Sequence, residues 1–158
     1  MSTSVFAWRL TSRAYADAAF DGEGARLYGG RWNSEGVAMV YLAGSLALAA
    51  LEQLVHLSRT DLLERQFVRF RVELPRSTVL ALDEAAIPPW WTEKRDVTRA
   101  LGDGWTEAEA SLALRVPSVV VPEEANYLVN PRHPDANQVQ IGDPEPYVFD
   151  ERLADMGS

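Results

Sequence analysis

The sequence predicts a single mixed α+β domain whose sheet is largely antiparallel and flanked by helices. Its 158 residues and 47% hydrophobic content suffice for one compact core. The apolar positions of its strand-like segments alternate more often than they run continuously, as in sheets with one solvated face. The helix-like segments differ in length, which disfavours a doubly wound parallel fold. We expect the domain to span residues 1–150 and residues 151–158 to form a polar C-terminal tail.

The first half of the chain is expected to supply three strands and one helix. Alternation predicts a strand at residues 5–10, and the glycine-dense segment 21–36 is expected to be a loop whose backbone can approach a ligand closely. A short apolar run predicts a second strand at residues 38–42. The segment 45–58 opens with a serine that can cap a helix, and its apolar residues point in almost every direction, so we expect this helix to be buried. Residues 66–74 alternate cleanly and predict a half-exposed strand.

The next segments predict a short strand and two further helices. We expect a strand at residues 78–82, followed by a stiff Pro-Pro-Trp-Trp connection at residues 88–91. A polar helix is expected around residues 96–101. The segment 106–114 opens with a Thr-x-x-Glu capping box and predicts another helix, which a proline would end.

The last part of the chain is expected to return to strands. The apolar run at residues 118–121 lies between two prolines and predicts a strand. Asn126 and Asn130 are expected on the loop that follows it. Residues 138–141 and 147–149 predict two late strands, which would complete the sheet.

The composition excludes several classes of function. There is no cysteine and there are two histidines, so disulfides and thiolate chemistry are excluded and we expect no metal site. A formal charge of −8 argues against direct nucleic-acid binding, which depends on clustered cations. No apolar window is long enough to span a membrane, and no signal segment opens the chain. We therefore expect a cytoplasmic protein.

Three separated motifs follow one another along the chain. Residues 28–42 read YGGRWNSEGVAMVYL, and an Ala-Leu-Glu triplet ending at Glu52 lies in the apolar helix that comes next. Residues 116–122 read VPSVVVP, with an Asn and an Asn-Pro pair downstream. This order of motifs, from about Phe6 to Tyr147, resembles the RES domain.

The RES family is named after an Arg, a Glu and a Ser, which fall here on Arg31, Glu52 and Ser118. The resemblance implies a fold related to ADP-ribosyltransferases and a toxin that depletes NAD⁺ by cleaving the bond between nicotinamide and ribose. NAD⁺ would be a consumed substrate, so no cofactor is expected. The resemblance also implies a partner, an Xre-like antitoxin that blocks the active site, with a homodimer of the toxin in that complex as an open question.

The outcome of the cleavage is left open by the motifs. The ADP-ribose could pass to water or phosphate, as in a glycohydrolase or phosphorylase, or to a host protein, as in a mono-ADP-ribosyltransferase. A non-catalytic module that binds a nucleotide or a partner is a third reading. The presence together of Arg31, Glu52 and Ser118 favours an enzyme.

The three name-giving residues are the expected catalytic set. Glu52 would stabilise the positive charge that develops on the ribose, since a carboxylate fixed nearby lowers the energy of an oxocarbenium-like transition state. Arg31 and Arg9 would hold the pyrophosphate, because guanidinium groups match planar arrays of phosphate oxygens. Ser118 would donate a hydrogen bond to the ribose or the amide of NAD⁺. A core ion pair between Glu52 and one of these arginines is the alternative.

Aromatic and amide side chains complete the expected NAD⁺ site. Tyr41 could stack on the nicotinamide while its hydroxyl reaches a polar atom, and Tyr28 is the second choice for this role. Asn126 would orient the same ligand. Ordinary core packing or a turn is the alternative for each of the three. His56 lies one turn after Glu52 on the expected helix, but we interpret it as a core residue and leave it out of the site.

Overall fold

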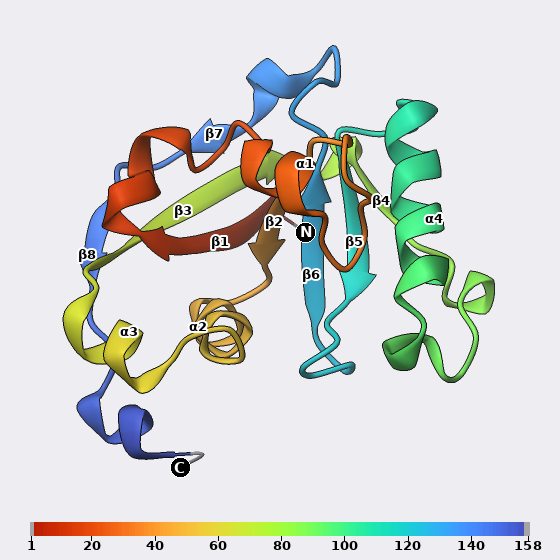
Figure 1. The fold of residues 1–158 in the computed structure, drawn as a ribbon. Helices are drawn as coiled ribbons and strands as arrows, with labels where there is room; N and C mark the ends of the chain where they lie inside the picture. Colours follow the sequence, from red (N-terminus) through yellow and green to blue (C-terminus); the bar gives the residue numbers. More distant parts are fainter. Residues whose placement is uncertain (1, 157–158) are drawn as a thin grey trace.

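A computed structural model of the protein, which describes residues 2–156, shows an α+β domain built on one eight-stranded sheet (Figure 1). The strand order is β4-β5-β6-β2-β1-β3-β7, and β8 pairs with β3. Every pairing is antiparallel except that between β4 and β5. The predicted fold class, a single mixed domain with a largely antiparallel sheet, is therefore confirmed.

The elements follow the chain in a simple order. The strands are β1 (Ser4–Ser12), β2 (Val40–Ala43), β3 (Phe67–Pro75), β4 (Val79–Ala81), β5 (Ala113–Pro117), β6 (Ala125–Val129), β7 (Gln140–Ile141) and β8 (Glu145–Tyr147). The α-helices are α1 (Glu23–Tyr28), α2 (Leu46–Leu54), α3 (Arg59–Glu64) and α4 (Arg95–Glu107). Short 3₁₀ turns lie at Arg13–Ala18, Arg76–Thr78, Glu84–Ala86, Trp91–Glu93, Ala136–Gln138 and Glu151–Asp155.

The pairing of β1 with β3 forms the longest ladder of the sheet. Nine residue pairs run from Ser4 opposite Pro75 to Ser12 opposite Phe67. Side chains directly opposite one another lie on the same face, so Ala7 and Val72 pack together in the core, both fully buried. On the other face, two arginines of β3 lie over aromatic rings of β1. The alternation of residues 5–10 and 66–74 predicted these two strands correctly.

The sheet almost divides between β1 and β2. The two strands share a single register pair, Trp8 opposite Ala43. In Figure 1, β1 and β3 run across the view whereas β5 and β6 run nearly vertically, so the two halves of the sheet splay apart at this point. The side chain of Arg9 crosses the gap, where Nη1 donates to the backbone oxygen of Tyr41 at 3.1 Å. This divergence leaves room for the pocket described below.

Helices cover the two halves of the sheet separately. Helix α4 lies beside β5 (Figure 1), and its Trp105 belongs to a buried cluster with Trp32 and Leu128. Helix α2 packs its buried residues Leu48 and Ala49 with aromatic and aliphatic side chains from β1, β3 and the C-terminal segment. The segment that carries Arg31 is therefore attached to one half of the domain and the helix that carries Glu52 to the other.

The helix predicted for residues 45–58 is shorter and less buried than expected. Ser45 caps it as predicted, since its side chain accepts from the N–H of Leu48 at 3.1 Å, but α2 ends at Leu54. Leu51 and Val55 are 42% and 60% exposed, so the prediction of a fully buried helix was wrong. A new helix, α3, starts because Ser58 and Asp61 form a capping box.

The helix predicted for residues 106–114 does not exist. Thr106 lies in the last turn of α4, where its hydroxyl donates to the oxygen of Gly102, and it therefore caps no new helix. Glu109 adopts a φ of 48°, which ends the helix. The apolar residues that follow form β5, whose Ala113 and Leu114 are buried between β4 and β6. Pairing with a strand on each side outweighs the local capping signal.

Three further local predictions were wrong. Residues 118–121 form no strand but the connection between β5 and β6, in which the hydroxyl of Ser118 accepts the N–H groups of Val120 and Val121. Asn126 lies on strand β6 and not on a loop. The segment 21–36 is also more ordered than a loop, because it contains α1 between Gly22 and Gly29.

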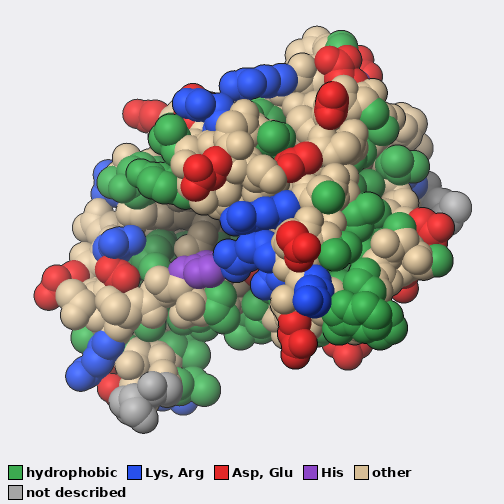
Figure 2. Space-filling model, turned by 45° about the vertical axis from the view of Figure 1, so that its right-hand side comes forward, with side chains coloured by type: hydrophobic (Ala, Val, Ile, Leu, Met, Phe, Trp, Pro, Cys, Tyr) green, Lys and Arg blue, Asp and Glu red, His purple; other side chains and the backbone are tan. Residues whose placement is uncertain are grey.

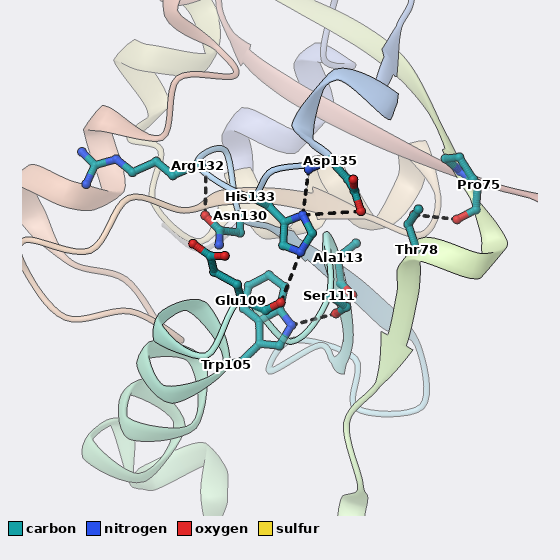
Figure 3. A network of polar contacts seen from close by, with 10 residues as sticks. All are labelled: Pro75, Thr78, Trp105, Glu109, Ser111, Ala113, Asn130, Arg132, His133 and Asp135. Carbon is teal, nitrogen blue, oxygen red and sulfur yellow. Dashed lines mark hydrogen bonds and ion pairs between the residues drawn. The ribbon is translucent and has the colours of Figure 1, made fainter.

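Side-chain contacts fix the end of α4 and the segment Glu151–Asp155. Figure 3 shows His133 accepting the N–H of Asp135 at Nδ1 and contacting the oxygen of Glu109 through Nε2, which links the end of α4 to the segment before β7. The expected C-terminal tail forms a 3₁₀ turn, in which Ala154 is buried and Asp155 lies 3.4 Å from Arg59. Residues 157 and 158 of that tail lie outside the described residues. Within residues 2–156, no helix combines the length and apolarity needed to cross a bilayer.

Candidate active site

A pocket of about 860 Å³ opens where β1 and β2 diverge. Its walls come from β1, the α1 segment, β2, α2, the start of α4, and the connection from β5 into β6. Figure 2 shows the molecule hollowed on one face, with Lys and Arg side chains gathered at the border of the hollow. The volume lies within the range of about 300–1,000 Å³ that is typical of small-molecule and cofactor sites.

Glu52 reaches this pocket because α2 is fixed at both ends. Ser45 caps the first turn, and near the last turn Gln53 Nε2 donates to the backbone oxygen of Leu10 at 2.7 Å, which ties the helix to β1. Glu52 is half-buried and lines the pocket. A sheet-anchored helix therefore holds the carboxylate in place.

One oxygen of the Glu52 carboxylate is held by two donors. Oε1 accepts from the hydroxyl of Ser118 at 2.7 Å and from Nδ2 of Asn126 at 2.8 Å. Ser118 is fully buried, and its own oxygen accepts from the N–H groups of Val120 and Val121 at 3.1 and 3.0 Å. The backbone therefore polarises the hydroxyl toward Glu52, and within residues 2–156 both donors to the carboxylate use Oε1.

Ser118 acts through Glu52 in this arrangement. The sequence led us to expect a direct hydrogen bond from Ser118 to NAD⁺, but the hydroxyl proton is directed to Glu52 and the side chain does not line the pocket. Ser118 therefore contacts Glu52 and not the open space of the pocket. Asn126, by contrast, lines the pocket itself.

Arg31 extends from the Gly-Gly-Arg-Trp-Asn segment at another part of the same pocket. Its Nη1 donates to the oxygen of Thr92 at 3.1 Å. Burial, and then the positive charge of Arg95, lowers the pKa of Arg31, whereas the charge of Glu52 raises it. The structure therefore brings Arg31 and Glu52 into one cleft, close enough for their charges to interact.

Two arginines that we did not predict lie beside Arg31. Arg95 lines the pocket from the first turn of α4, and Arg99 donates from Nε to the oxygen of Gly30 at 2.7 Å. Within the described part of the chain, none of these three arginines, nor Arg9, has a carboxylate oxygen within 4.0 Å. Such a cluster on a protein of net charge −8 is suited to an anion. The spacing of Arg95 and Arg99, four residues apart on the helix predicted around residues 96–101, is the signal that could have found them.

Hydrogen bonds and close packing from helix α4 hold the segment that carries Arg31. The hydroxyl of Thr98 donates to the backbone oxygen of Arg31, and the carboxylate of Asp103 accepts from both the N–H and the hydroxyl of Ser34. Gly102 allows close approach, since a Cβ there would lie 1.7 Å from the backbone oxygen of Trp32. The Arg31 segment is therefore held by tertiary contacts.

Asn33 organises the same segment from within. It is fully buried, and its Nδ2 donates to the oxygens of Ala25 and Val37 at 2.8 and 3.0 Å. Its Oδ1 accepts from the hydroxyl of Tyr41 at 2.6 Å. The sequence predicted no role for Asn33, and these contacts give it a structural one within the segment.

Tyr41 lines the pocket, but its hydroxyl is hydrogen-bonded within the protein. The hydroxyl donates to Asn33 and accepts from the N–H of Trp32 at 3.0 Å, and burial raises the pKa of Tyr41 to about 12. A Cβ on Gly30 would meet this hydroxyl at 2.6 Å, so a larger residue there would have to displace the Tyr41 hydroxyl. The ring of Tyr41 remains available for stacking. Its hydroxyl, which we expected to contact a polar atom of the ligand, is hydrogen-bonded to Asn33 instead.

Arg9 bridges the two halves of the sheet at the bottom of the site. Its Nε donates to the oxygen of Ala19 at 2.5 Å and Nη1 to that of Tyr41 at 3.1 Å. Burial lowers the pKa of Arg9 to about 10, an effect that the negative charge of Asp21 partly offsets. Arg9 is thus a cation at neutral pH, lines the pocket, and also carries structural hydrogen bonds.

Tyr28 and His56 lie at the border of the pocket. Tyr28 lines the pocket from the end of α1 and is 78% exposed. His56 is exposed and lines the pocket, so our interpretation of it as a core residue was wrong. Helix α2 ends before His56, and this places the imidazole outside the core. Among residues 2–156, no group of three or more His, Asp or Glu side chains is placed to hold a metal ion.

Comparison with known proteins identifies the family. A family model described as the RES domain matches residues 6–150. The protein named Toxin Res from Yersinia enterocolitica is 39% identical over 150 residues, covering 92% of this chain and 97% of that protein. The Prs ADP-ribosylating toxin of a Sphingobium species is 40% identical over 160 aligned positions, covering 97% of this chain and 98% of that protein.

A solved structure shares the fold. A chain in the crystal structure of the MbcT–MbcA toxin–antitoxin complex of M. tuberculosis superposes with a TM-score of 0.71, covering 96% of this chain and 87% of that one. The two sequences are 20% identical, so this likeness shows the fold alone. The family model and the two relatives cover nearly the whole domain, and the chain therefore belongs to the RES-domain family of toxins.

Proposed function

We propose that the protein is the toxin of a toxin–antitoxin pair and an enzyme that cleaves the nicotinamide–ribose bond of NAD⁺. The observation that carries this proposal is the single pocket lined by both Glu52 and Arg31, with Arg95 beside the latter. A dinucleotide has a sugar that becomes positive in the reaction and a pyrophosphate that is negative throughout. The pocket offers one carboxylate and a separate group of cations, which match these two parts.

Glu52 would act on the ribose. As the bond from C1′ to the pyridinium nitrogen breaks, its electron pair goes to the nitrogen and nicotinamide leaves as a neutral molecule. The ribose gains positive charge in the transition state, and a fixed carboxylate lowers the energy of that charge. The hydrogen bonds from Ser118 and Asn126 hold Oε1, so no reorientation of Glu52 is needed during the step.

The arginines would hold the phosphates. Arg31 and Arg95 both line the pocket, and a guanidinium can donate two parallel hydrogen bonds to phosphate oxygens. The anion would also relieve the repulsion between Arg31 and Arg95 that lowers the pKa of Arg31. Tyr41 or Tyr28 would stack on an aromatic ring of the substrate.

The acceptor of the ADP-ribose distinguishes two versions of the proposal. If water attacks C1′, its oxygen replaces the nicotinamide nitrogen and one proton is released to solvent; phosphate would attack in the same way. Transfer to a protein is the second candidate, and the name of the Sphingobium relative, an ADP-ribosylating toxin, favours it. Both versions share the first step, the release of nicotinamide.

A protein antitoxin would control this activity in the cytoplasm. The related fold seen in a toxin–antitoxin complex supports such a partner. We propose that an Xre-like antitoxin covers the open side of the pocket between α2 and the Arg31 segment and so excludes NAD⁺. A toxin homodimer in that complex stays a separate proposal.

Release of nicotinamide from NAD⁺ by the purified chain tests the proposed activity. We expect release by the wild type, loss of it in Glu52→Ala, and no change in Glu64→Ala, an exposed glutamate of α3 outside the pocket. Equal rates in the wild type and Glu52→Ala would contradict the proposal. Labelled NAD⁺ added to a cell lysate then separates the two versions, because only transfer labels a protein band.

A further inference from the structure

Oδ1 of Asn126 is a buried polar atom without a hydrogen-bond partner within residues 2–156. Buried acceptors are almost always paired, because desolvation without a hydrogen bond costs free energy. Asn126 also lines the pocket, next to the carboxylate proposed to act on the ribose. An unpaired acceptor at this place indicates that a donor arrives with the ligand.

The orientation of the Asn126 amide is fixed by its neighbour. Nδ2 donates to Oε1 of Glu52 at 2.8 Å, and the reverse orientation would place two oxygen acceptors against each other. The backbone is fixed as well, because Asn126 on β6 pairs with Ala43 on one side and Val116 on the other. Oδ1 is therefore a stationary acceptor.

Asn126 and Glu52 together present two neighbouring acceptors. Both donors on Glu52 use Oε1, and within residues 2–156 no hydrogen bond reaches Oε2. Because Oδ1 and Nδ2 of Asn126 belong to one amide group, the contact through Nδ2 also keeps Oδ1 near the carboxylate. Two adjacent acceptors match two hydroxyl donors on adjacent carbons. In NAD⁺, the 2′- and 3′-hydroxyls of the nicotinamide ribose form such a pair beside the bond that breaks.

We propose that Asn126 is a specificity-determining residue whose Oδ1 accepts the 3′-hydroxyl of the nicotinamide ribose while Oε2 of Glu52 accepts the 2′-hydroxyl. The inference rests on the proposed function and goes further, because it assigns the pocket a preference for a ribose with an intact cis-diol. The carboxamide of nicotinamide also carries N–H donors. We favour the diol because Oδ1 lies beside the carboxylate that must reach the sugar.

A cycle between protein and substrate tests the pairing. The rate constant kcat/KM for nicotinamide release is measured for the wild type and Asn126→Ala, each with NAD⁺ and with an analogue that lacks the 3′-hydroxyl on the nicotinamide ribose. Loss of one hydrogen bond corresponds to about tenfold. We expect this fall from either change alone and no further fall from both together, because they remove the same interaction. Independent, multiplying effects would overturn the inference.

An analogue with a dimethylated carboxamide serves as the competing arm. If the effect of Asn126→Ala disappears with this analogue and persists with the 3′-deoxy analogue, Oδ1 binds the carboxamide and the diol assignment is wrong. Asn137→Ala, an exposed asparagine outside the pocket, is the matched control and should behave as the wild type. The wild-type penalty with the 3′-deoxy analogue needs no variant, so its absence would count against the inference even if Asn126→Ala failed to fold. No release from NAD⁺ by the wild type would instead refute the proposed function itself.

Discussion

The hydroxyl of Ser118 donates a 2.7 Å hydrogen bond to Glu52 while its oxygen accepts two backbone N–H groups. The two residues lie 66 positions apart in the sequence, on the β5–β6 connection and on helix α2. The Ser118 side chain therefore both fixes the β5–β6 connection and orients the Glu52 carboxylate. A serine without exposed surface can thus still affect the pocket, because it bonds to a residue that lines it.

Removal of the Ser118 hydroxyl should cost both activity and stability. In Ser118→Ala, Glu52 loses a donor and the N–H groups of Val120 and Val121 lose their acceptor. Displacement of a catalytic group by about 1 Å can lower a rate ~100-fold, so we expect kcat for nicotinamide release to fall ~10- to 100-fold. The unpaired buried groups should lower the free energy of unfolding by about 1–3 kcal/mol, measured by denaturant titration.

Ser111→Ala provides the matched control for that variant. The hydroxyl of Ser111 accepts from Trp105 Nε1 at 2.8 Å and donates to the oxygen of Ala113 at 2.7 Å, away from the pocket (Figure 3). We expect a similar loss of stability and no loss of kcat in the folded protein. Equal losses of kcat in the two variants would show that Ser118 contributes only to folding.

Two glycines of α4 should respond oppositely to alanine. In Gly102→Ala the new Cβ would lie 1.7 Å from the oxygen of Trp32, so the Arg31 segment must move; we expect about 1–3 kcal/mol of destabilisation and a large loss of activity. At Gly104 a Cβ meets nothing within 4 Å, and Gly104→Ala should stabilise the exposed helix by up to about 1 kcal/mol with normal activity. Thermal melts of the two variants check this. A stable, active Gly102→Ala would contradict the close packing of α4 on the segment.

Arg95 should contribute to substrate affinity through charge. Because a charge-assisted hydrogen bond is stronger than a neutral one, we expect Arg95→Ala to raise KM for NAD⁺ about tenfold and to change kcat little. Added salt should weaken NAD⁺ binding more in the wild type than in Arg95→Ala. Arg76→Ala is the control, since Arg76 is exposed and bonds to backbone oxygens near the N-terminus. A KM that is unchanged in Arg95→Ala would remove Arg95 from the phosphate site.

The raised pKa of Tyr41 predicts an alkaline loss of stability. Burial raises it from 10.0 to about 12, so the folded protein holds the phenol proton more tightly than the unfolded chain does. This contribution to the free energy of unfolding is fully present below pH 10 and is lost as the pH rises from 10 to about 12. The difference between the ultraviolet phenolate titrations of the wild type and Tyr41→Phe should isolate one group with a midpoint near 12. A midpoint near 10 would mean that the hydroxyl is accessible to water.

Local patterns in the sequence predicted the parts of the fold that local physics determines. The alternation at residues 5–10 and 66–74 predicted β1 and β3, because a half-buried strand imposes a period of two on its own residues. The helix predicted at residues 106–114 failed because an apolar run beside a capping box fits either element. The pairing of β5 with both β4 and β6, which no local pattern shows, decided the outcome.

The sequence predicted several members of the site but not their contacts. Motifs identified Arg31, Glu52 and Ser118, yet the sequence could not show that Ser118 binds Glu52 and not the substrate. The use of the Tyr41 hydroxyl by Asn33 was equally hidden, because both residues meet only after the segment folds back. Such hydrogen bonds form between residues that only the tertiary fold brings together, so the residue types alone do not predict them.

A crystal structure of the Glu52→Gln variant with NAD⁺ tests the central claim most directly. The isosteric change should slow cleavage and leave the pocket intact, so the dinucleotide should be seen whole. We expect its pyrophosphate against Arg31 and Arg95 and C1′ of the nicotinamide ribose beside position 52. A dinucleotide bound elsewhere, or with its phosphates away from both arginines, would contradict the account.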